Sequence, residues 1–402
     1  MTTTAGSPVT LLAETLLTPS QQLCPGWVTV SGPAVVAVGS GLPPRAGELV
    51  DLGGRVLAPG FVDLHVHGGA GAQVNGATAR DVADSVRRMA AHHARHGTTA
   101  LLATTVSDTP ARLLETLRGI GLCLAGPPAG GARVLGAHLE GPWLAPAMAG
   151  AQDLRFLRLP DLEELTTLLD GHRDVVRMVT IAPELPGALD VVAALVEARV
   201  VASIGHTEAD LATTRAAVAV GARHVTHLFN RMPGLHHRRP GPVGLALTDE
   251  RLTVELVPDG IHVDPLVIAL VMRAAAGRVV AVTDAVAASG QPGGTQRIGE
   301  LEVEVAEGRV VLAAAPETLA GSVVTMDHAV ANLVAAGVSM TDAVSAATET
   351  PARVIGEGAR GRIEVGSSAD LVVLEPSLRC SATVVAGRAV FDPTRLLAGR
   401  LG

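Results

Sequence analysis

Two histidines that end an apolar run near residue 60 are the first candidates for chemistry. Residues 59–69 have the sequence PGFVDLHVHGG, and strand alternation puts Asp63, His65 and His67 on one face. At a strand end, two neighbouring imidazoles form a metal-ligand pair. A lone His-x-His motif is explained more simply by one packed and one solvent-facing histidine, so its meaning depends on the later strands.

Further imidazoles and carboxylates follow later apolar runs, each at the C-terminal end of an expected strand: Glu140, His206, His227, Asp259 with His262, and Asp284. In a parallel barrel all strands end at the same rim, where such side chains converge. Taken singly, His206 and His227 could be packed imidazoles bonded to backbone carbonyls. Together with Glu140, whose burial without a partner would be costly, they form a ligand set suited to Zn²⁺ or another first-row divalent cation.

Three more segments are candidates for catalysis or substrate binding. Asp284 either caps the following helix or acts as a general base beside a metal, and we favour the second role. The segment 236–239 (HHRR) is either a solvated loop or an anion site, because arginine offers a planar fork of donors. Leu319 and Gly321 begin an expected helix, where small residues would let the backbone approach a ligand.

The elements that must position these residues change character along the chain. Residues 8–57 are short β-type runs separated by Gly and Pro, typical of a small antiparallel sheet. β-type sequence returns from residue 355. Between them, helical segments alternate with short apolar strands, which predicts a parallel sheet. We therefore predict an α/β fold with a (β/α)8 barrel over residues 58–354 and a small β-sandwich domain formed by residues 1–57 and 355–402. The clearest expected helices are 78–96, 160–171, 188–198, 209–220 and 265–275.

Composition excludes several classes of partner. Of the 402 residues, 48% are hydrophobic but only 1% are aromatic, so Ala, Val and Leu must fill the core and few rings are available to stack on bases. The formal net charge of -8 also opposes nucleic-acid binding. Three widely spaced cysteines suit a reducing compartment. We see no signal peptide and no apolar run of the ~18–20 residues that a membrane span needs, so we expect a cytoplasmic protein.

Taken together, the motifs resemble those of the N-acetylglucosamine-6-phosphate deacetylases of the amidohydrolase superfamily. The resemblance covers nearly the whole chain, and the motifs occur in the family's order at residues 59–69, 138–142, 205–207, 226–230, 259–262, 282–285 and 319–322. It implies that Glu140, His206 and His227 are the main metal ligands and that His65 and His67 support a second metal. Each subunit would then hold one or two divalent ions, with Zn²⁺ as the first choice and Fe, Mn or Co as alternatives.

The resemblance also implies how the substrate is held. Asn230 and Arg238 would bind its phosphate, with Arg238 reaching the neighbouring site of a homodimer. His262 would contact the substrate, and Asp284 would be the catalytic acid and base. The expected reaction is hydrolysis of the acetamide of N-acetylglucosamine 6-phosphate.

Two residues depart from the family pattern and bear on the substrate. Arg231 stands where a small residue is usual, and Gln152 replaces a histidine that commonly reaches the sugar. Neither change alters a metal ligand or Asp284, so hydrolysis is retained as the expectation. The alternatives are deacetylation of the galactosamine epimer or another N-acyl amino sugar, a different amidohydrolase reaction on a cyclic amide, and a catalytically inactive sugar-phosphate sensor.

Overall fold

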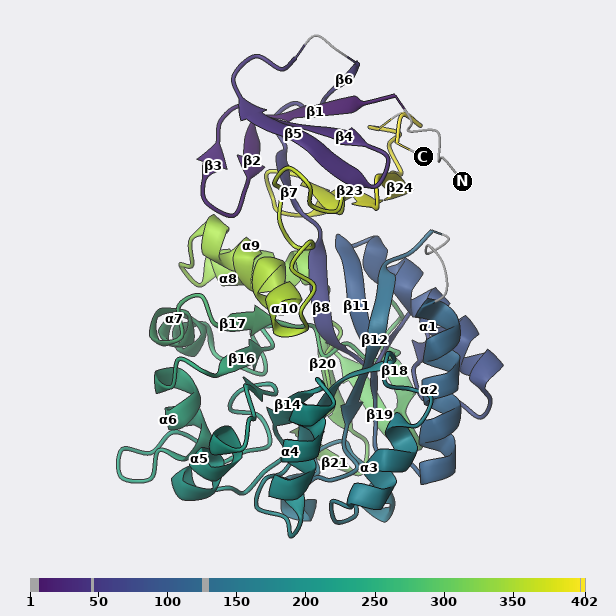
Figure 1. Cartoon of the computed structure of the whole chain (residues 1–402), viewed down its shortest axis with the longest axis vertical. Helices are drawn as coiled ribbons and strands as arrows, with labels where there is room; N and C mark the ends of the chain where they lie inside the picture. Colours follow the sequence, from purple (N-terminus) through teal and green to yellow (C-terminus); the bar gives the residue numbers. More distant parts are fainter. Residues whose placement is uncertain (1–6, 45–46, 125–129, 398, 402) are drawn as a thin grey trace.

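Eight parallel strands form a barrel-like sheet in the larger, lower part of the molecule (Figure 1). The computed structural model describes residues 7–44, 47–124, 130–397 and 399–401. Around the sheet the strands follow their order in the chain, as successive βα units require. They are β8 (Phe61–Val66), β11 (Thr98–Thr105), β12 (Arg133–Glu140), β13 (Val176–Ile181), β14 (Val201–Ile204), β15 (His224–Val225), β16 (Thr253–Leu256) and β17 (Val279–Ala281).

The first and last strands of this sheet meet at the rim that carries the candidate residues. Val66 and Ala285 form a parallel bridge. The backbone N–H of Asp284 donates to the carbonyl of His65 at 2.9 Å, and that of His67 donates to the carbonyl of Ala285 at 2.8 Å. The barrel therefore closes through the residues that the sequence marks as functional.

Helices surround the barrel, and all five expected helices are present with ends shifted by a few residues. Several begin at a side chain that caps the first turn, such as Thr78, Asp161 and Asp210. None of the helices in the described ranges is both long and apolar enough to cross a membrane. The helices are α1 (Ala79–Ala94), α2 (Pro110–Leu124), α3 (Leu162–Leu169), α4 (Ala188–Glu197), α5 (Leu211–Ala219), α6 (Gly241–Thr248), α7 (Pro265–Ala274), α8 (Met326–Ala335), α9 (Met340–Ala347) and α10 (Glu349–Val354).

An antiparallel sheet that the sequence analysis missed is inserted between β17 and α8. Its strands are β18 (Gly294–Ile298), β19 (Leu301–Ala306), β20 (Arg309–Leu312) and β21 (Ala315–Leu319). In β19 the buried Val303 and Val305 alternate with exposed residues, which is the signal that could have revealed it. The expectation that a helix begins at Leu319 is wrong, because Leu319 ends β21 and the helix begins only at Met326.

Two further sheets are drawn at the top of Figure 1, one formed by N-terminal strands and the other by strands from both ends of the chain. One has the order β5-β4-β1-β6, and β6 pairs parallel with β1, so this sheet is mixed where an antiparallel one was expected. The other has the order β24-β23-β22-β7-β2-β3, in which β22 near the C-terminus pairs antiparallel with β7. Leu11, Leu57, Leu371 and Val384 share one buried cluster. The domain boundaries at residues 57 and 355 remain a prediction.

The strands of these sheets are β1 (Val9–Ala13), β2 (Thr15–Leu17), β3 (Gln22–Leu23), β4 (Gly26–Ser31), β5 (Ala34–Ser40), β6 (Glu48–Asp51), β7 (Val56–Pro59), β22 (Leu371–Leu374), β23 (Cys380–Val385) and β24 (Arg388–Phe391). A short hairpin, β9 (Gly68–Gly69) and β10 (Ala72–Gln73), follows β8. Two 3₁₀ turns, η1 (Pro146–Met148) and η2 (Leu154–Phe156), follow β12.

Candidate active site

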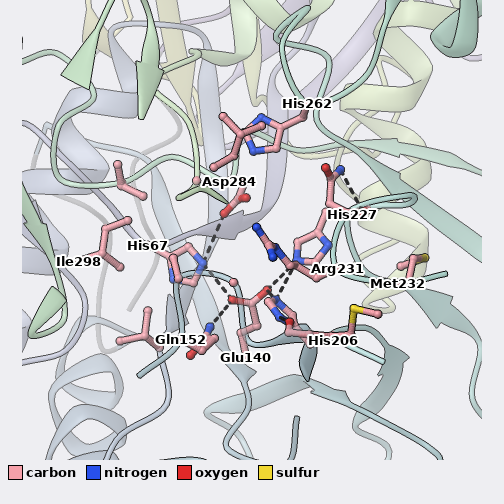
Figure 2. A pocket seen from close by; sticks show the side chains of 18 of the residues that line it. His67, Glu140, Gln152, His206, His227, Arg231, Met232, His262, Asp284 and Ile298 are labelled. Atoms are coloured by element: carbon pink, nitrogen blue, oxygen red, sulfur yellow. Dashed lines mark hydrogen bonds and ion pairs between the residues drawn. The ribbon is translucent and has the colours of Figure 1, made fainter. Parts of the chain in front are cut away.

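Glu140, the last residue of β12, lies at the centre of the site and is contacted by four imidazoles, of which Figure 2 shows His67, His206 and His227. Its Oε1 lies 3.2 Å from Nε2 of His206 and 3.1 Å from Nε2 of His227. His65 Nε2 lies 3.3 Å from the same oxygen. His67 Nε2 lies 3.3 Å from Oε2. The structure thus brings together side chains that are far apart in the chain.

Potential ligand atoms form three groups, and two of them adjoin around Glu140. Glu140, His206 and His227 make one set, and His65, His67 and Asp284 make the other. The third group is His65, His138 and Glu255. In the second set Asp284 Oδ1 lies 3.4 Å from His67 Nε2 and 3.5 Å from His65 Nε2. A tetrahedral cation with ligands at about 2.1 Å keeps its ligand atoms about 3.4 Å apart, so the spacing in both sets suits a bound metal.

Hydrogen bonds on the outer side of two rings fix which nitrogen faces Glu140. His65 Nδ1 donates to Glu255 Oε2 at 3.0 Å, and His206 Nδ1 donates to the carbonyl of Met148 at 2.8 Å. A neutral ring that donates from Nδ1 presents a lone pair at Nε2. These lone pairs point at carboxylate oxygens, an arrangement that is repulsive unless a cation lies between them. The mixed N/O donor set therefore fits a first-row divalent metal.

The backbone at three of these positions lies in the left-handed region. His206 has φ 47°, His227 has φ 26° and Asp284 has φ 49°. Each comes just after a barrel strand, and such conformations cost of order 1–3 kcal/mol for residues other than glycine. The fold holds these side chains in place against that cost, as functional sites commonly do.

Burial and the neighbouring imidazoles have opposite effects on the carboxylates of the site. Burial alone would raise the pKa of Asp284, but without a metal the rings of His65 and His67 are protonated and hold it below its ordinary value. Burial likewise opposes ionisation of Glu140, yet His65 and His206 keep its pKa well below the usual range. Asp284 is therefore ionised at neutral pH and can accept a proton.

A cavity of about 310 Å³ lies over these residues. The inserted sheet closes one side of it with Ile298, Glu317 and Leu319. His65 does not line the cavity and is fully buried behind it. The cavity is lined by the predicted residues His67, Glu140, Gln152, His206, His227, Asn230, Arg231, His262, Asp284, Leu319 and Gly321.

Comparison with known proteins assigns the family. A sequence model of the amidohydrolase family matches residues 56–390, which is most of the chain. The chain belongs to the amidohydrolase family. Its predicted barrel fold is thereby confirmed. The family is metal-dependent, in agreement with the two ligand sets of this amidohydrolase.

Named relatives match this amidohydrolase over most of their own length. It is 39% identical over 357 residues to human N-acetylglucosamine-6-phosphate deacetylase, covering 86% of each chain. It is 37% identical to N-acetylgalactosamine-6-phosphate deacetylase of Escherichia coli O157:H7, covering 83% of this chain and 87% of that one. A mutant Mycobacterium smegmatis N-acetyl-D-glucosamine-6-phosphate deacetylase, solved with N-acetyl-D-glucosamine-6-phosphate, superposes with a TM-score of 0.90 at 39% identity, covering 96% of this chain and 100% of that chain.

The residues predicted to bind substrate in this amidohydrolase are held in different ways. His262 Nδ1 donates to Asp259 Oδ2 at 2.7 Å, and although burial would lower the pKa of His262, this carboxylate keeps it above its ordinary value. Gln152 Nε2 donates to Glu140 Oε2 at 2.6 Å. Asn230 Nδ2 donates to the carbonyl of His227 at 3.2 Å.

The structure does not bring Arg238 to the cavity of its own chain. Arg238 lines a separate hollow beside α5, together with Arg215, His236 and Arg239. A role for Arg238 in this amidohydrolase therefore requires another subunit, and that role stays a prediction.

Two more buried carboxylates, Glu255 and Asp63, lie beside the site, and the sequence analysis missed the first of them. Glu255 lies in the apolar strand β16, in the same kind of setting that identified Glu140, but was overlooked. Burial would raise its pKa, whereas His65 and His224 hold it well below the ordinary value. Asp63, predicted to share a face with the histidines, accepts hydrogen bonds from the Thr283 hydroxyl at 2.6 Å and the Thr283 N–H at 3.2 Å.

Proposed function

We propose that this chain hydrolyses the acetamide of N-acetylglucosamine 6-phosphate to glucosamine 6-phosphate and acetate. The observation that carries the proposal is the approach of four imidazole Nε2 atoms to one carboxylate, Glu140, with Asp284 beside them under the cavity. The names of the human and mycobacterial relatives support the choice of substrate.

Zn²⁺ is the proposed metal, held by Glu140, His206 and His227, with His65, His67 and Asp284 as a second position. Iron, manganese and cobalt share these ligand types. When bound, the metal would polarise the acetamide carbonyl and increase the acidity of the attacking water.

Asp284 is the proposed proton carrier of the reaction. Its ionised carboxylate takes a proton from the water that attacks the acetamide carbon. It then returns that proton to the nitrogen as the carbon–nitrogen bond breaks, so that the amino sugar and acetate separate. Because one carboxyl group serves both steps, no second acid is needed.

His262 is the proposed stabiliser of the developing oxyanion. It lines the cavity with Asp284, and the hydrogen bond from its Nδ1 to Asp259 fixes the ring. A proton on Nε2 would then point away from Asp259 and could be donated to the oxygen that gains charge. The raised pKa of His262 supports this protonated form.

Arg231 is the proposed phosphate ligand supplied by the chain itself. Of the described residues that line the cavity, Arg231 is the one that carries a guanidinium group. Its side chain packs over Gly150, where an added Cβ would lie 2.9 Å from Nε of Arg231. Asn230, and Arg238 from the second subunit of a homodimer, would complete the phosphate site.

Unpaired cysteines at positions 24, 123 and 380 support a cytoplasmic location.

Acetate release from three substrates tests this function. The proposal predicts efficient turnover of N-acetylglucosamine 6-phosphate and at least about tenfold lower kcat/KM for unphosphorylated N-acetylglucosamine, a difference of about 1.4 kcal/mol. Preference for N-acetylgalactosamine 6-phosphate would instead assign the enzyme to the activity named for its Escherichia coli relative. A fully metallated enzyme that releases acetate from none of the three would contradict the proposal.

A further inference from the structure

Glu255 occupies a position in the barrel that the proposed reaction does not use. It lies in β16, its side chain is fully buried, and three hydrogen-bond donors converge on its two oxygens. Oε2 accepts from His65 Nδ1 at 3.0 Å and from the backbone N–H of His227 at 3.2 Å. Oε1 accepts from His224 Nε2 at 3.0 Å.

The two contacts of Oε2 reach both ligand sets of the proposed metal centre. His65 belongs to the set with His67 and Asp284, and His227 belongs to the set with Glu140 and His206. A single oxygen of Glu255 therefore touches one member of each set. Among the described residues that belong to neither set, no other carboxylate oxygen lies within 3.5 Å of a member of each set.

Each contact controls a different property of its ligand. The bond to His65 Nδ1 fixes the tautomer of that ring, so that Nε2 carries the lone pair that faces the metal position. The bond to His227 holds a backbone that has φ 26°, a conformation unfavourable for a histidine. His227 depends on this support because its buried Nδ1 has no hydrogen-bond partner among the described residues.

We propose that Glu255 is a positioning residue that fixes His65 and His227 together and so couples the two ligand sets of the metal centre. This inference rests on the proposed metal-dependent function. Its distinctive claim is that the loss of Glu255 weakens metal binding even where the polypeptide remains folded.

The direct test is zinc binding by the Glu255→Leu variant. Leucine offers no acceptor, so His65 Nδ1 and the backbone N–H of His227 both lose the partner that they share. Wild type and variant are stripped with a chelator and titrated with Zn²⁺ against a chromophoric competitor. Removal of comparable outer-shell partners weakens metal binding about 10–100-fold, and we expect a loss of this size.

His224→Gln is the matched control, because it alters the same buried network on the side of Oε1 and can still donate to Glu255. The inference predicts that His224→Gln keeps wild-type zinc affinity, although its melting temperature can fall. Equal loss of zinc affinity in both variants would overturn the inference, since general damage to the network would then explain the effect.

Folding and the proposed function are separated by the same measurements. Circular dichroism of the metal-free proteins shows whether Glu255→Leu is folded. If it is not, Glu255→Asp keeps the charge but is too short to reach both ligands, and the same loss is expected. Wild-type zinc affinity in a folded variant overturns the inference alone. Failure of the wild type to bind zinc would instead count against the proposed function.

Discussion

Gln152 donates a hydrogen bond of 2.6 Å from its amide to Oε2 of Glu140, the carboxylate on which four histidines converge. The amide oxygen of Gln152 in turn accepts from the backbone N–H of Ser107 at 2.7 Å. The amide of Gln152 is therefore anchored through both its nitrogen and its oxygen. It orients a proposed metal ligand as well as lining the substrate cavity.

Replacing Gln152 with leucine should impair catalysis through Glu140. The change removes the donor at nearly constant volume, and a hydrogen bond to a charged group contributes about 1.5–3 kcal/mol. We expect kcat/KM to fall about 10–100-fold, measured by acetate release at saturating metal. Unchanged kinetics would show that the 2.6 Å bond has no catalytic consequence.

Replacing Arg231 with serine should raise KM for the phosphorylated substrate and leave kcat nearly unchanged. The guanidinium would bind the phosphate equally in the ground and transition states, so its loss removes uniform binding. Unphosphorylated N-acetylglucosamine should react equally well with both proteins. Arg297→Ala, in a neighbouring hollow, is the control for a lost surface cation. A matching loss for both sugars would argue against a phosphate role.

Arg238 should act on the cavity of a partner subunit. Arg238→Ala is expected to bind the phosphorylated substrate weakly, and Asp284→Asn is expected to be inactive. When the two are mixed and allowed to exchange subunits, the Asp284→Asn chain can supply Arg238 to a site that keeps Asp284. Low-KM activity should then return. If mixing restores nothing although size measurements show mixed dimers, Arg238 does not act across subunits.

Asp63 should make the metal-free protein less stable as the pH rises. Burial raises the pKa of Asp63 from 3.8 to about 7, so between these values the folded state binds a proton that the unfolded state has lost. The free energy of unfolding contributed by Asp63 therefore decreases from pH 4 to pH 7 and is then constant. Urea unfolding of wild type and Asp63→Asn at pH 5 and pH 8 measures this. A difference between the two proteins that does not vary with pH would refute it.

The chemistry of the strand ends could be predicted from the sequence because barrel geometry is regular. Glu140, His206 and His227 follow apolar runs, and parallel strands deliver their last residues to one rim. Glu255 escaped notice because no motif singled it out within a strand of four residues. Its role emerges only from its contacts with His65 and His227.

Other features depend on contacts that a local pattern cannot specify. The hydrogen bond from Gln152 to Glu140 joins a side chain in the loop between η1 and η2 to the last residue of β12. The inserted sheet was missed because short runs such as β21 contain Pro and Glu, which weaken the strand pattern. The separation of Arg238 from its own cavity likewise depends on where the loop after His227 leads.

Asp284 is proposed to transfer the proton in a metal-dependent deacetylation, and the Asp284→Asn variant is the sharpest test of that role. Acetate release from N-acetylglucosamine 6-phosphate should be measured for wild type and variant, with the metal content of each recorded. We expect the variant to retain metal at Glu140, His206 and His227. Its kcat should fall at least about a thousandfold, which corresponds to an activation free energy raised by about 4 kcal/mol. A metallated Asp284→Asn enzyme with near wild-type kcat would contradict it.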